Sequence, residues 1–309
     1  MKDLIIIGGD LRFVYAANKL KKSNPNFSCA IYGFDLLHED VQSEAHEVDF
    51  IKKIEPAKNV ILPLPMSRNC DYITAPYHSG RISIPDVIAN ACTYDTTVFC
   101  GKACPELQEL CERDSLTLCD YFEREELTVV NAGITAEGAL EIIMREKAKA
   151  VLGMKILITG YGRISKILAR HLHTLGANVT IAARKHADLA WAKVNGCRAV
   201  KFGDEFDSVL ENFDTIVNTV PAQILTRKRL LKLREDCLIV DLASKTGVEG
   251  MELSKSGSVS VAGVKVIWAL SLPGKLNCGN YFILISLFFP STTILSTKTS
   301  AIRFLRMLS

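Results

Sequence analysis

The sequence predicts an α/β protein composed of two domains, each organised around a parallel sheet. Short apolar runs alternate with helical patterns along most of the 309-residue chain. Most of these runs are continuously apolar, which is typical of strands that helices cover on both faces. The alternation of strand and helix occurs twice, once in each half, and the length suits two domains of about 150 residues.

The apolar runs predict five strands in the first half and six in the second. Those of the first half cover residues 4–9, 29–34, 59–65, 97–100 and 127–131. Those of the second half cover residues 155–160, 178–183, 198–202, 215–220, 237–243 and 264–270. Each set, with its intervening helices, makes one α/β unit.

A connecting helix is predicted between the two sets of strands, over residues 136–150. Good helix formers and apolar spacing mark it, Thr135 is a suitable N-cap, and Glu137 lies in the first turn, where the helix dipole favours an acid. We therefore expect an N-terminal domain, a linking helix, a second domain and an atypical tail. Their bounds are 1–130, 131–152, 153–275 and 276–309.

Charge and cysteine content narrow the class of protein. Lys and Arg number 37 against 34 Asp and Glu, and this net charge of +3 argues against nucleic acid as a partner. The apolar stretch before Gly8 is too short for a secretory signal, so the ten cysteines are expected to be reduced thiols of a cytoplasmic protein. Their spacing matches no common zinc pattern, and no metal is predicted. The apolar run 281–289 is too short to cross a membrane, which takes about 20 residues.

A glycine motif in the second half carries the strongest chemical signal. The strand at 155–160 leads into Gly160-Tyr-Gly162-Arg163-Ile164-Ser165, followed by a helical pattern and a further strand. This order of elements is the context that a dinucleotide fingerprint requires, because the first glycine permits a tight turn and the second admits a pyrophosphate to the helix N-terminus. Residues 153–275 are therefore predicted to form a Rossmann domain that binds NAD(P), with Gly160, Gly162, Arg163 and Ile164 at the cofactor.

The residue after the next strand bears on the choice between NADP and NAD. Arg184 stands 24 residues after Gly160, where an acid would accept hydrogen bonds from the ribose of NAD. A guanidinium suits a 2′-phosphate by charge and by geometry, so the sequence favours NADP, with NAD still possible. A solvated arginine at a strand end is the alternative interpretation.

Polar residues also end two later strands of this half. Asn218, Val220 and Pro221 close one strand, and we expect contacts between this segment and the nicotinamide ribose. Asp241 closes the next strand and is predicted to lie at the cofactor, and the Ser244 and Lys245 that follow could bind an anionic substrate. An ordinary strand exit, and a turn with a solvated lysine, are the respective alternatives.

Two segments of the first half are candidates for substrate binding. Gly8-Gly9-Asp10-Leu-Arg12 follows the first strand and offers Arg12 as a clamp for a carboxylate, although a surface position for Arg12 is equally compatible with the sequence. Ser67 follows Leu62-Pro-Leu-Pro-Met, whose prolines bend the chain away from the sheet. No nucleophile with an adjacent base stands out.

Taken as an ordered set, these motifs resemble the family of the dipicolinate synthase A subunit, found in spore-forming bacteria. The resemblance covers about residues 1–275. The first group of motifs is Gly8-Gly9-Asp10-x-Arg12, Tyr32-Gly-Phe-Asp35, Leu62-Pro-Leu-Pro-Met-Ser67 and Asn131-Ala-Gly-Ile-Thr135-Ala-Glu137-Gly138. The second group is Gly160-Tyr-Gly-Arg163, Ala183-Arg184, Asn218-Thr-Val-Pro221, Asp241-Leu-Ala-Ser-Lys245 and Leu272-Pro-Gly-Lys275.

The resemblance implies two Rossmann-like domains with parallel sheets, with cofactor and substrate in the cleft between them. It also implies an oxidoreductase that makes dipicolinate from hydroxy-tetrahydrodipicolinate by dehydration and oxidation, with a nicotinamide as hydride acceptor. The N-terminal domain would bind the dicarboxylate substrate. Substrate-binding residues would be Arg12, Ser67, Thr135, Ser244 and Lys275, and Glu137 and Lys245 would be catalytic. A second, flavoprotein-like subunit, an oligomer, and the cytoplasm of the mother cell of a sporulating bacterium are implied as well.

The tail departs from the family pattern. After Leu272-Pro-Gly-Lys275 the sequence no longer follows the family, and no Asp or Glu occurs from Leu253 onward. A slip of reading frame near residue 276 is our hypothesis for this change. Two other functions are compatible with the same architecture: a shikimate- or alanine-dehydrogenase-like enzyme, and a non-catalytic nucleotide-binding subunit.

Overall fold

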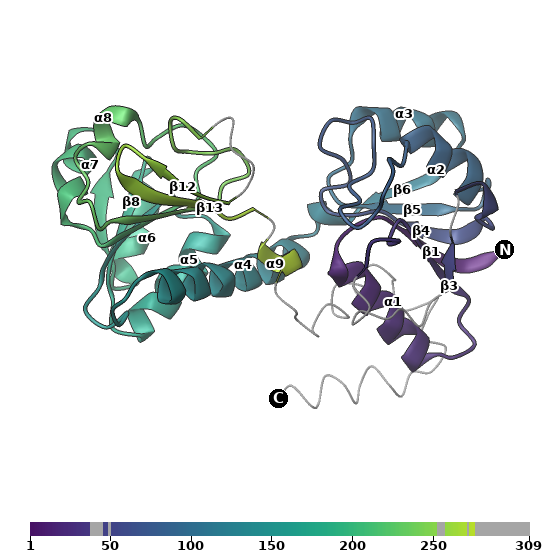
Figure 1. Ribbon diagram of the computed structural model, residues 1–309, viewed down its shortest axis with the longest axis horizontal. Helices are drawn as coiled ribbons and strands as arrows, with labels where there is room; N and C mark the ends of the chain where they lie inside the picture. The colour runs from purple at the N-terminus through teal and green to yellow at the C-terminus, as the bar shows by residue number, and fades with distance from the viewer. Residues whose placement is uncertain (38–45, 49–50, 252–256, 271, 276–309) are drawn as a thin grey trace. The chain divides into compact units, whose positions relative to one another are not determined.

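The computed structural model describes residues 1–37, 46–48, 51–251, 257–270 and 272–275. Within this part, the chain forms two compact units, one over Met1–Thr128 and one that begins at Val129 (Figure 1). Each unit is an α/β layer structure around a mainly parallel sheet, as predicted. The tail from residue 276 onward lies outside the described residues.

The N-terminal unit contains a six-stranded parallel sheet in the order β3-β2-β1-β4-β5-β6. Its strands are β1 (Lys2–Ile7), β2 (Cys29–Tyr32), β3 (His46–Val48), β4 (Ala57–Ile61), β5 (Thr97–Cys100) and β6 (Thr117–Asp120). Its helices are α1 (Leu11–Ser23), α2 (Ile84–Ala91) and α3 (Pro105–Arg113), with 3₁₀ turns η1 (Ile51–Lys53) and η2 (Tyr121–Glu123). The chain order reverses between β1 and β4, which makes their carboxyl ends the switch point of this sheet.

Both faces of this sheet are buried, which explains its continuously apolar strands. Leu4 and Ile6 of β1 pack on the side of α1, whereas Ile5 and Ile7 pack on the side of α2 and α3 (Figure 1). The helices begin where the sequence supplies caps: Asp10 accepts the backbone N–H of Arg12 at α1, and Ser83 accepts that of Asp86 at α2.

The prediction for residues 127–131 is wrong, because they belong to helix α4 (Glu125–Glu146). Leu127 is buried, whereas Val129 and Val130 are exposed, a periodicity that a strand covered on both faces does not show. The apolar run suggested a strand, but the apolar residues form a stripe that a helix buries on one side. The sixth strand is β6 instead, a four-residue edge strand with little apolar character.

Helix α4 begins ten residues before the predicted N-cap, so the expected cap at Thr135 is also wrong. By length and composition alone, α4 could span a membrane, but half of its apolar window is buried within the protein. A helix in a protein core passes the same test, so this finding is weak evidence for a membrane.

The C-terminal unit contains a seven-stranded sheet in the order β12-β13-β11-β10-β7-β8-β9. Its strands are β7 (Lys155–Thr159), β8 (Asn178–Ala183), β9 (Arg198–Lys201), β10 (Thr215–Asn218), β11 (Leu238–Asp241), β12 (Gly257–Val261) and β13 (Val264–Trp268). Its other elements are α5 (Arg163–Thr174), α6 (His186–Val194), α7 (Asp204–Val209), η3 (Leu210–Asn212), α8 (Arg227–Leu230) and α9 (Leu272–Lys275). All its strand pairs are parallel except β12 with β13, an antiparallel edge that the sequence did not predict.

Two apolar cores cover the faces of the second sheet. Ile156 and Ile158 of β7 pack with α4, α5 and α6, and Leu157 packs with α7 and α8 (Figure 1). Strands β7 and β10 are neighbours in the sheet, and the order of the strands along the chain reverses between them. Their carboxyl ends therefore form the switch point of this sheet.

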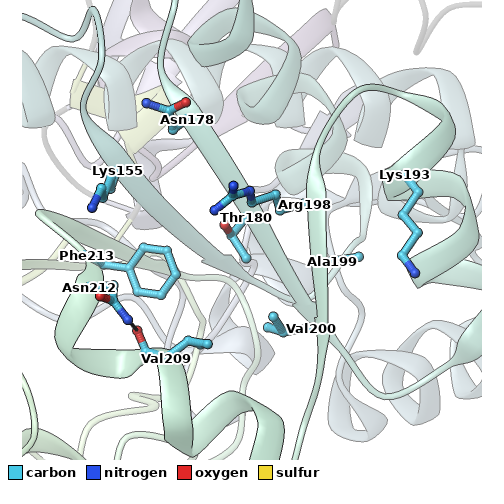
Figure 2. Close-up of a pocket in the computed structure, with 10 residues that line it drawn as sticks. All are labelled: Lys155, Asn178, Thr180, Lys193, Arg198, Ala199, Val200, Val209, Asn212 and Phe213. Atoms are coloured by element: carbon cyan, nitrogen blue, oxygen red, sulfur yellow. Dashed lines mark hydrogen bonds between the residues drawn. The ribbon is translucent and has the colours of Figure 1, made fainter.

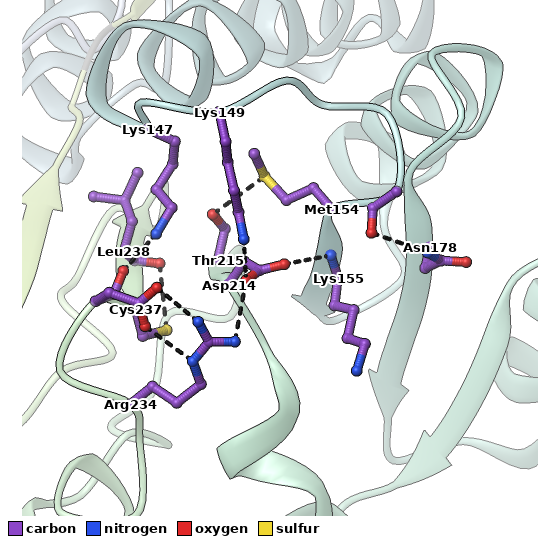
Figure 3. A network of polar contacts seen from close by, with 12 residues as sticks. Lys147, Lys149, Met154, Lys155, Asn178, Asp214, Thr215, Arg234, Cys237 and Leu238 are labelled. Carbon is purple, nitrogen blue, oxygen red and sulfur yellow. Dashed lines mark hydrogen bonds and ion pairs between the residues drawn. The ribbon is translucent and has the colours of Figure 1, made fainter.

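A polar network ties the opposite, amino-terminal ends of β7 and β10 together (Figure 3). The buried Asp214 carboxylate accepts hydrogen bonds from Lys149 Nζ at 2.6 Å, the backbone N–H of Lys155 at 2.8 Å and Arg234 Nη1 at 3.2 Å. Burial opposes ionisation of Asp214, but the hydrogen bonds and the charges of Lys149 and Arg234 prevail and lower its pKa.

We expect Asp214→Asn to lower the free energy of unfolding of this unit by about 1–3 kcal/mol, because a buried carboxylate loses its cationic partners. The lowered pKa means that this stabilisation is complete above the ordinary carboxyl value of about 3.9 and is lost as pH falls through the native pKa. Urea unfolding of both proteins at pH 7 and in steps below pH 4 measures the effect. A difference that stays constant over that range would contradict this interpretation.

Candidate functional site

The glycine turn of the C-terminal unit lies at the carboxyl end of β7, at the switch point. Gly160 has φ +85°, and a Cβ there would lie 2.8 Å from Thr219 Oγ1, so both conformation and space require glycine. Gly162 is the exposed N-cap of α5, and a Cβ there would meet nothing within 4 Å. The first N–H groups of α5 have no acceptors within the helix. Because Gly162 has no side chain, a pyrophosphate could approach these N–H groups without a steric clash.

A buried serine replaces the third glycine of the fingerprint. Ser165 is fully buried, and its Oγ lies 2.9 Å from Thr219 Oγ1, which in turn donates to the Thr159 carbonyl at 2.8 Å. The hydroxyl thus joins α5 to the ends of β7 and β10. A small residue fits here because α5 packs closely on the sheet.

Asp241 holds together the loops that follow β10 and β11. The carboxylate is completely buried and accepts hydrogen bonds from Asn218 Nδ2, the backbone N–H groups of Ala243 and Gly247, and Thr246 Oγ1, at 2.7–3.2 Å. Burial raises its pKa, although every one of these bonds acts in the opposite direction. In the structure the Asp241 side chain joins these loops from within, and the role at a cofactor that sequence reasoning gave it stays a prediction.

Asn218 has the same internal role. Its Oδ1 accepts from Thr159 Oγ1 at 2.7 Å and from the Val220 N–H at 3.1 Å, and its Nδ2 donates to Asp241 and to the Val220 carbonyl. The residue is fully buried, so its side chain serves the interior of this edge, and the expected contact of the segment with a nicotinamide ribose stays a prediction. Gly247 packs so closely on this amide that a Cβ there would overlap it.

The other predicted cofactor residues lie around this edge. Arg163 is exposed and Ile164 partly buried in the first turn of α5, Val220 is partly buried and Pro221 is exposed after β10. Arg184 directly follows β8 and is exposed. These residues lie at the expected carboxyl edge, and their role at a cofactor stays a prediction.

Ser244 and Lys245 are exposed in the turn after β11, at the same edge. The preceding Ala243 carbonyl accepts the indole N–H of Trp268 at 2.9 Å, which fixes the start of this turn to β13. Lys275 is the last residue of α9, and its side chain lies outside the described part of the structure.

The proposed clamp of the N-terminal unit is already paired. Arg12 is buried, and its guanidinium binds Asp10 through Nε at 2.6 Å and Nη2 at 2.7 Å, with a further bond to the Leu64 carbonyl at 3.3 Å. A substrate carboxylate would therefore have to displace Asp10. The expectation of an open arginine clamp is wrong in this structure.

Three further expected residues are placed differently from their predictions. Ser67 Oγ donates to the Tyr72 carbonyl at 2.6 Å and accepts from the Cys70 N–H, so it stabilises a turn. Thr135 is buried within α4 and donates to the Asn131 carbonyl at 2.7 Å. Glu137 is exposed in the middle of α4, where the N-terminal helix dipole does not act on it.

A histidine–aspartate pair was missed by sequence reasoning. His78 Nδ1 contacts Asp35 Oδ1, and the two residues are 43 positions apart in the chain. Asp35 belongs to the Tyr32-Gly-Phe-Asp35 motif that follows β2, which was the available signal, but nothing in the sequence indicated its partner.

A cavity of about 800 Å³ lies away from the glycine turn (Figure 2). Lys155, Asn178 and Arg198, the first residues of β7, β8 and β9, line it with Thr180, the neighbour of Arg198 across the strand pair. Open α/β sheets bind ligands in a crevice at the carboxyl ends of their strands, whereas this cavity lies at the amino ends. It is therefore not the expected cofactor site. Among the described residues, no group of three or more His, Cys, Asp and Glu side chains could hold a metal ion.

Comparison with known proteins shows what the chain is similar to. A family model described as the N-terminal domain of the dipicolinate synthase A subunit matches residues 3–122. The whole chain is 25% identical over 276 residues to the dipicolinate synthase A subunit of Bacillus subtilis (strain 168), covering 88% of this chain and 89% of that protein. The resemblance indicated by the ordered motifs is therefore confirmed.

Solved structures confirm the fold. The dipicolinate synthase A subunit of Bacillus halodurans matches with a TM-score of 0.77 at 23% identity, covering 93% of this chain and 96% of that one. The corresponding chain of dipicolinate synthase from Bacillus subtilis matches with a TM-score of 0.73 at 24% identity, covering 93% and 94%. A second family model, described as the NAD binding domain of D-isomer specific 2-hydroxyacid dehydrogenase, matches residues 136–264. Together with the glycine turn, these findings support an oxidoreductase with a nicotinamide cofactor.

Proposed function

We propose that this chain is the NADP-linked oxidoreductase subunit of dipicolinate synthase, which converts 4-hydroxy-tetrahydrodipicolinate to dipicolinate during sporulation. The observation that carries the proposal is an open glycine turn at the switch point of a nucleotide-binding sheet, in a chain similar to the dipicolinate synthase A subunit over 88% of its length. The name of that relative supplies the product, and the family models supply the domain types.

The reaction removes water from the ring and then a hydride and a proton, which leaves an aromatic pyridine dicarboxylate. A nicotinamide cofactor held at the glycine turn would supply the hydride acceptor. The chain's own residues bind and orient the ring and move protons, and aromatisation supplies driving force. Ser244 and Lys245 are proposed to hold a substrate carboxylate, since they are exposed at the cofactor edge. Lys245 and Glu137 are retained as proposed catalytic groups.

The preference for NADP is proposed on the position of Arg184. The residue is exposed directly after β8, and no described residue forms an ion pair with it. In this type of domain, the strand after the glycine-turn helix ends beside the adenosine ribose. A guanidinium there binds a 2′-phosphate and gains nothing from a 2′-hydroxyl.

We expect Arg184→Asp to weaken NADP binding by about 10-fold to 100-fold, because a charged hydrogen bond is lost and a repulsion is added. NAD binding should change by less than about 3-fold. Fluorescence titration with both reduced cofactors measures both constants. Arg198→Asp is the matched control, since Arg198 begins β9 and therefore lies at the amino-terminal ends of the parallel strands, away from the carboxyl ends where Arg184 lies. Equal losses for NADP and NAD would contradict the assignment.

Formation of dipicolinate tests the function directly. The assay supplies aspartate semialdehyde, pyruvate, the upstream synthase and NADP, and follows the ultraviolet absorbance of dipicolinate with and without the flavoprotein subunit. We expect product that depends on this chain. No product in either mixture, from a chain that still binds NADP, would favour a non-catalytic nucleotide-binding subunit.

The flavoprotein-like second subunit of dipicolinate synthase is proposed as the partner in a hetero-oligomer, and the mother-cell cytoplasm as the location. The name of the relative, a synthase subunit designated A, supports a partner subunit. The flavoprotein character of that partner and the location follow from the family resemblance of the ordered motifs. Co-purification of the two subunits from a sporulating culture would support the assembly.

One observation favours a second candidate function. Residues 136–264 match the nucleotide-binding domain of 2-hydroxyacid dehydrogenases, so a dehydrogenase acting on a small 2-hydroxy acid is compatible with this unit. Turnover of lactate or glycerate analogues in the absence of dipicolinate formation would select that candidate.

A further inference from the structure

Polar side chains gather at the carboxyl edge of the N-terminal sheet, apart from the groups already assigned. After β2 the chain turns at Gly33 and reaches Asp35, and a loop that follows β4 lies against this turn. The loop is fixed in place by backbone hydrogen bonds from Gly9 N to the Thr74 carbonyl at 2.8 Å and from Leu36 N to the Tyr77 carbonyl at 2.9 Å. His78 therefore reaches the edge of the sheet on a held segment.

The imidazole of His78 is oriented through one nitrogen, and its second nitrogen has no hydrogen-bond partner among the described residues. Its Nδ1 contacts Asp35 Oδ1, and its ring packs on the Tyr32 ring with centroids 5.3 Å apart. Asp35 is itself fixed by the Ser79 N–H, whose nitrogen lies 3.1 Å from Oδ2. Among the described residues, none forms a hydrogen bond with His78 Nε2, although the side chain is only 11% exposed.

We propose that His78 is the general acid–base for the dehydration of the ring substrate, and that Asp35 is its positioning residue. This inference rests on the proposed function, whose substrate carries a hydroxyl that must leave. Acid–base catalysis requires an imidazole that is held through one nitrogen while the other can exchange a proton with the substrate. His78 is largely buried at the carboxyl edge of the N-terminal sheet and is held through Nδ1.

The step balances in atoms and electrons. Nε2 takes a proton from the ring carbon beside the carbinol carbon, and the electrons of that C–H bond form a carbon–carbon double bond as the C–O bond breaks. The leaving hydroxide takes the proton from Nε2 and departs as water. His78 ends as it began, and the hydride transfer that follows needs only the cofactor named in the proposed function.

Asp35 supports this cycle because it stays ionised. Burial would raise its pKa, but hydrogen bonds from Ser79 and His78 outweigh it and lower the pKa to about 2. A carboxylate on Nδ1 places the proton there, which leaves Nε2 as the acceptor, and it stabilises the imidazolium formed in the step.

Other charged and titratable groups around the pair come from several elements. Tyr32 lies on β2 against the imidazole ring, and burial followed by the charges of Asp35 and Asp86 raises its pKa. Tyr77 precedes His78, and burial followed by Asp10 raises its pKa. Both phenols are therefore neutral at physiological pH, and Asp35 is the charge in direct contact with the imidazole.

The test compares variants in the dipicolinate assay with the full chain and its partner. We expect His78→Gln to lower kcat by about 100-fold or more, with little change in KM, NADP affinity or melting temperature. In His78→Gly, added imidazole should restore part of the rate, which a purely structural role would not allow. Asp35→Asn should lower kcat by about 10-fold with little change in KM, because the carboxylate that orients the imidazole and stabilises the imidazolium formed in the step is gone.

Controls separate this inference from the function on which it rests. His173→Gln, an exposed histidine of α5, should have no effect, and Glu137→Gln compares the other proposed proton carrier. Absence of dipicolinate from the unmodified protein would remove the proposed function. If the unmodified protein is active and His78→Gln is fully active as well, the inference about His78 is overturned while the proposed function stands. A loss of activity in Glu137→Gln but not in His78→Gln would have the same meaning.

Discussion

Gly162→Asp should abolish dinucleotide binding while leaving the protein folded. Gly162 caps α5 with φ −85°, a conformation open to any residue, and a Cβ there meets nothing within 4 Å. The substitution therefore costs little in folding. It does place a carboxylate where a pyrophosphate must approach the N–H groups of α5, so steric exclusion and repulsion act together. We expect NADP affinity to fall by about 100-fold or more, which corresponds to about 2.7 kcal/mol.

Titration calorimetry with NADP, together with thermal unfolding, measures both halves of this prediction. Gly162→Ala should give a smaller loss, since it adds one carbon and no charge. Gly133→Asp is the matched control, because Gly133 lies on α4 and a Cβ there also meets nothing within 4 Å. Undiminished NADP binding by Gly162→Asp would place the cofactor elsewhere.

Asp241→Ala should have the largest effect on stability, a loss of about 3–4 kcal/mol in the free energy of unfolding of the C-terminal unit. The substitution leaves four donors without their acceptor at a fully buried point, and each unsatisfied buried donor costs about 1–3 kcal/mol before relaxation. The loops after β10 and β11 lose their common anchor. NADP affinity should fall as well, although Asp241 is too deeply buried to contact a ligand.

Denaturant unfolding followed by far-ultraviolet circular dichroism gives the stability change. Asp236→Ala serves as the control, since its exposed ion pair with Arg234 should contribute less than about 1 kcal/mol. A direct cofactor ligand would behave differently from a buried anchor: its loss would weaken binding and leave stability unchanged. That pattern in Asp241→Ala would restore the role that the sequence first suggested.

The comparison of prediction and structure is most instructive at α4. Residues 127–131 were predicted as a strand from their apolar run, yet a helix buries Leu127 and exposes Val129 and Val130. For this short segment, the choice between strand and helix depends on which parts of the protein pack against it. The local sequence does not contain that information. The edge strands β6 and β12 were missed for a related reason, since partly exposed strands lack a continuous apolar run, and the three residues of β3 are too few to form one.

The candidate site divides in the same way. The glycine turn and Arg184 could be found from sequence because their chemistry depends on positions close together in the chain. Asn218 and Asp241 were predicted at a cofactor, and that role stays a prediction. Their internal hydrogen bond could not be foreseen, since it joins residues 23 positions apart. Arg12 was expected to be open, and only the folded turn shows that Asp10 occupies it.

By itself, the sequence determined two α/β units, the strands of their buried interiors, the nucleotide-binding turn and the resemblance to the dipicolinate synthase A subunit. These features follow from local periodicity, turn chemistry and the order of motifs. Only the tertiary structure decided which polar side chains are satisfied inside the protein and which stay available, such as His78 with Asp35. Hydrogen-bond partners of buried groups come from whichever segments the fold brings together, and desolvation makes those partnerships obligatory.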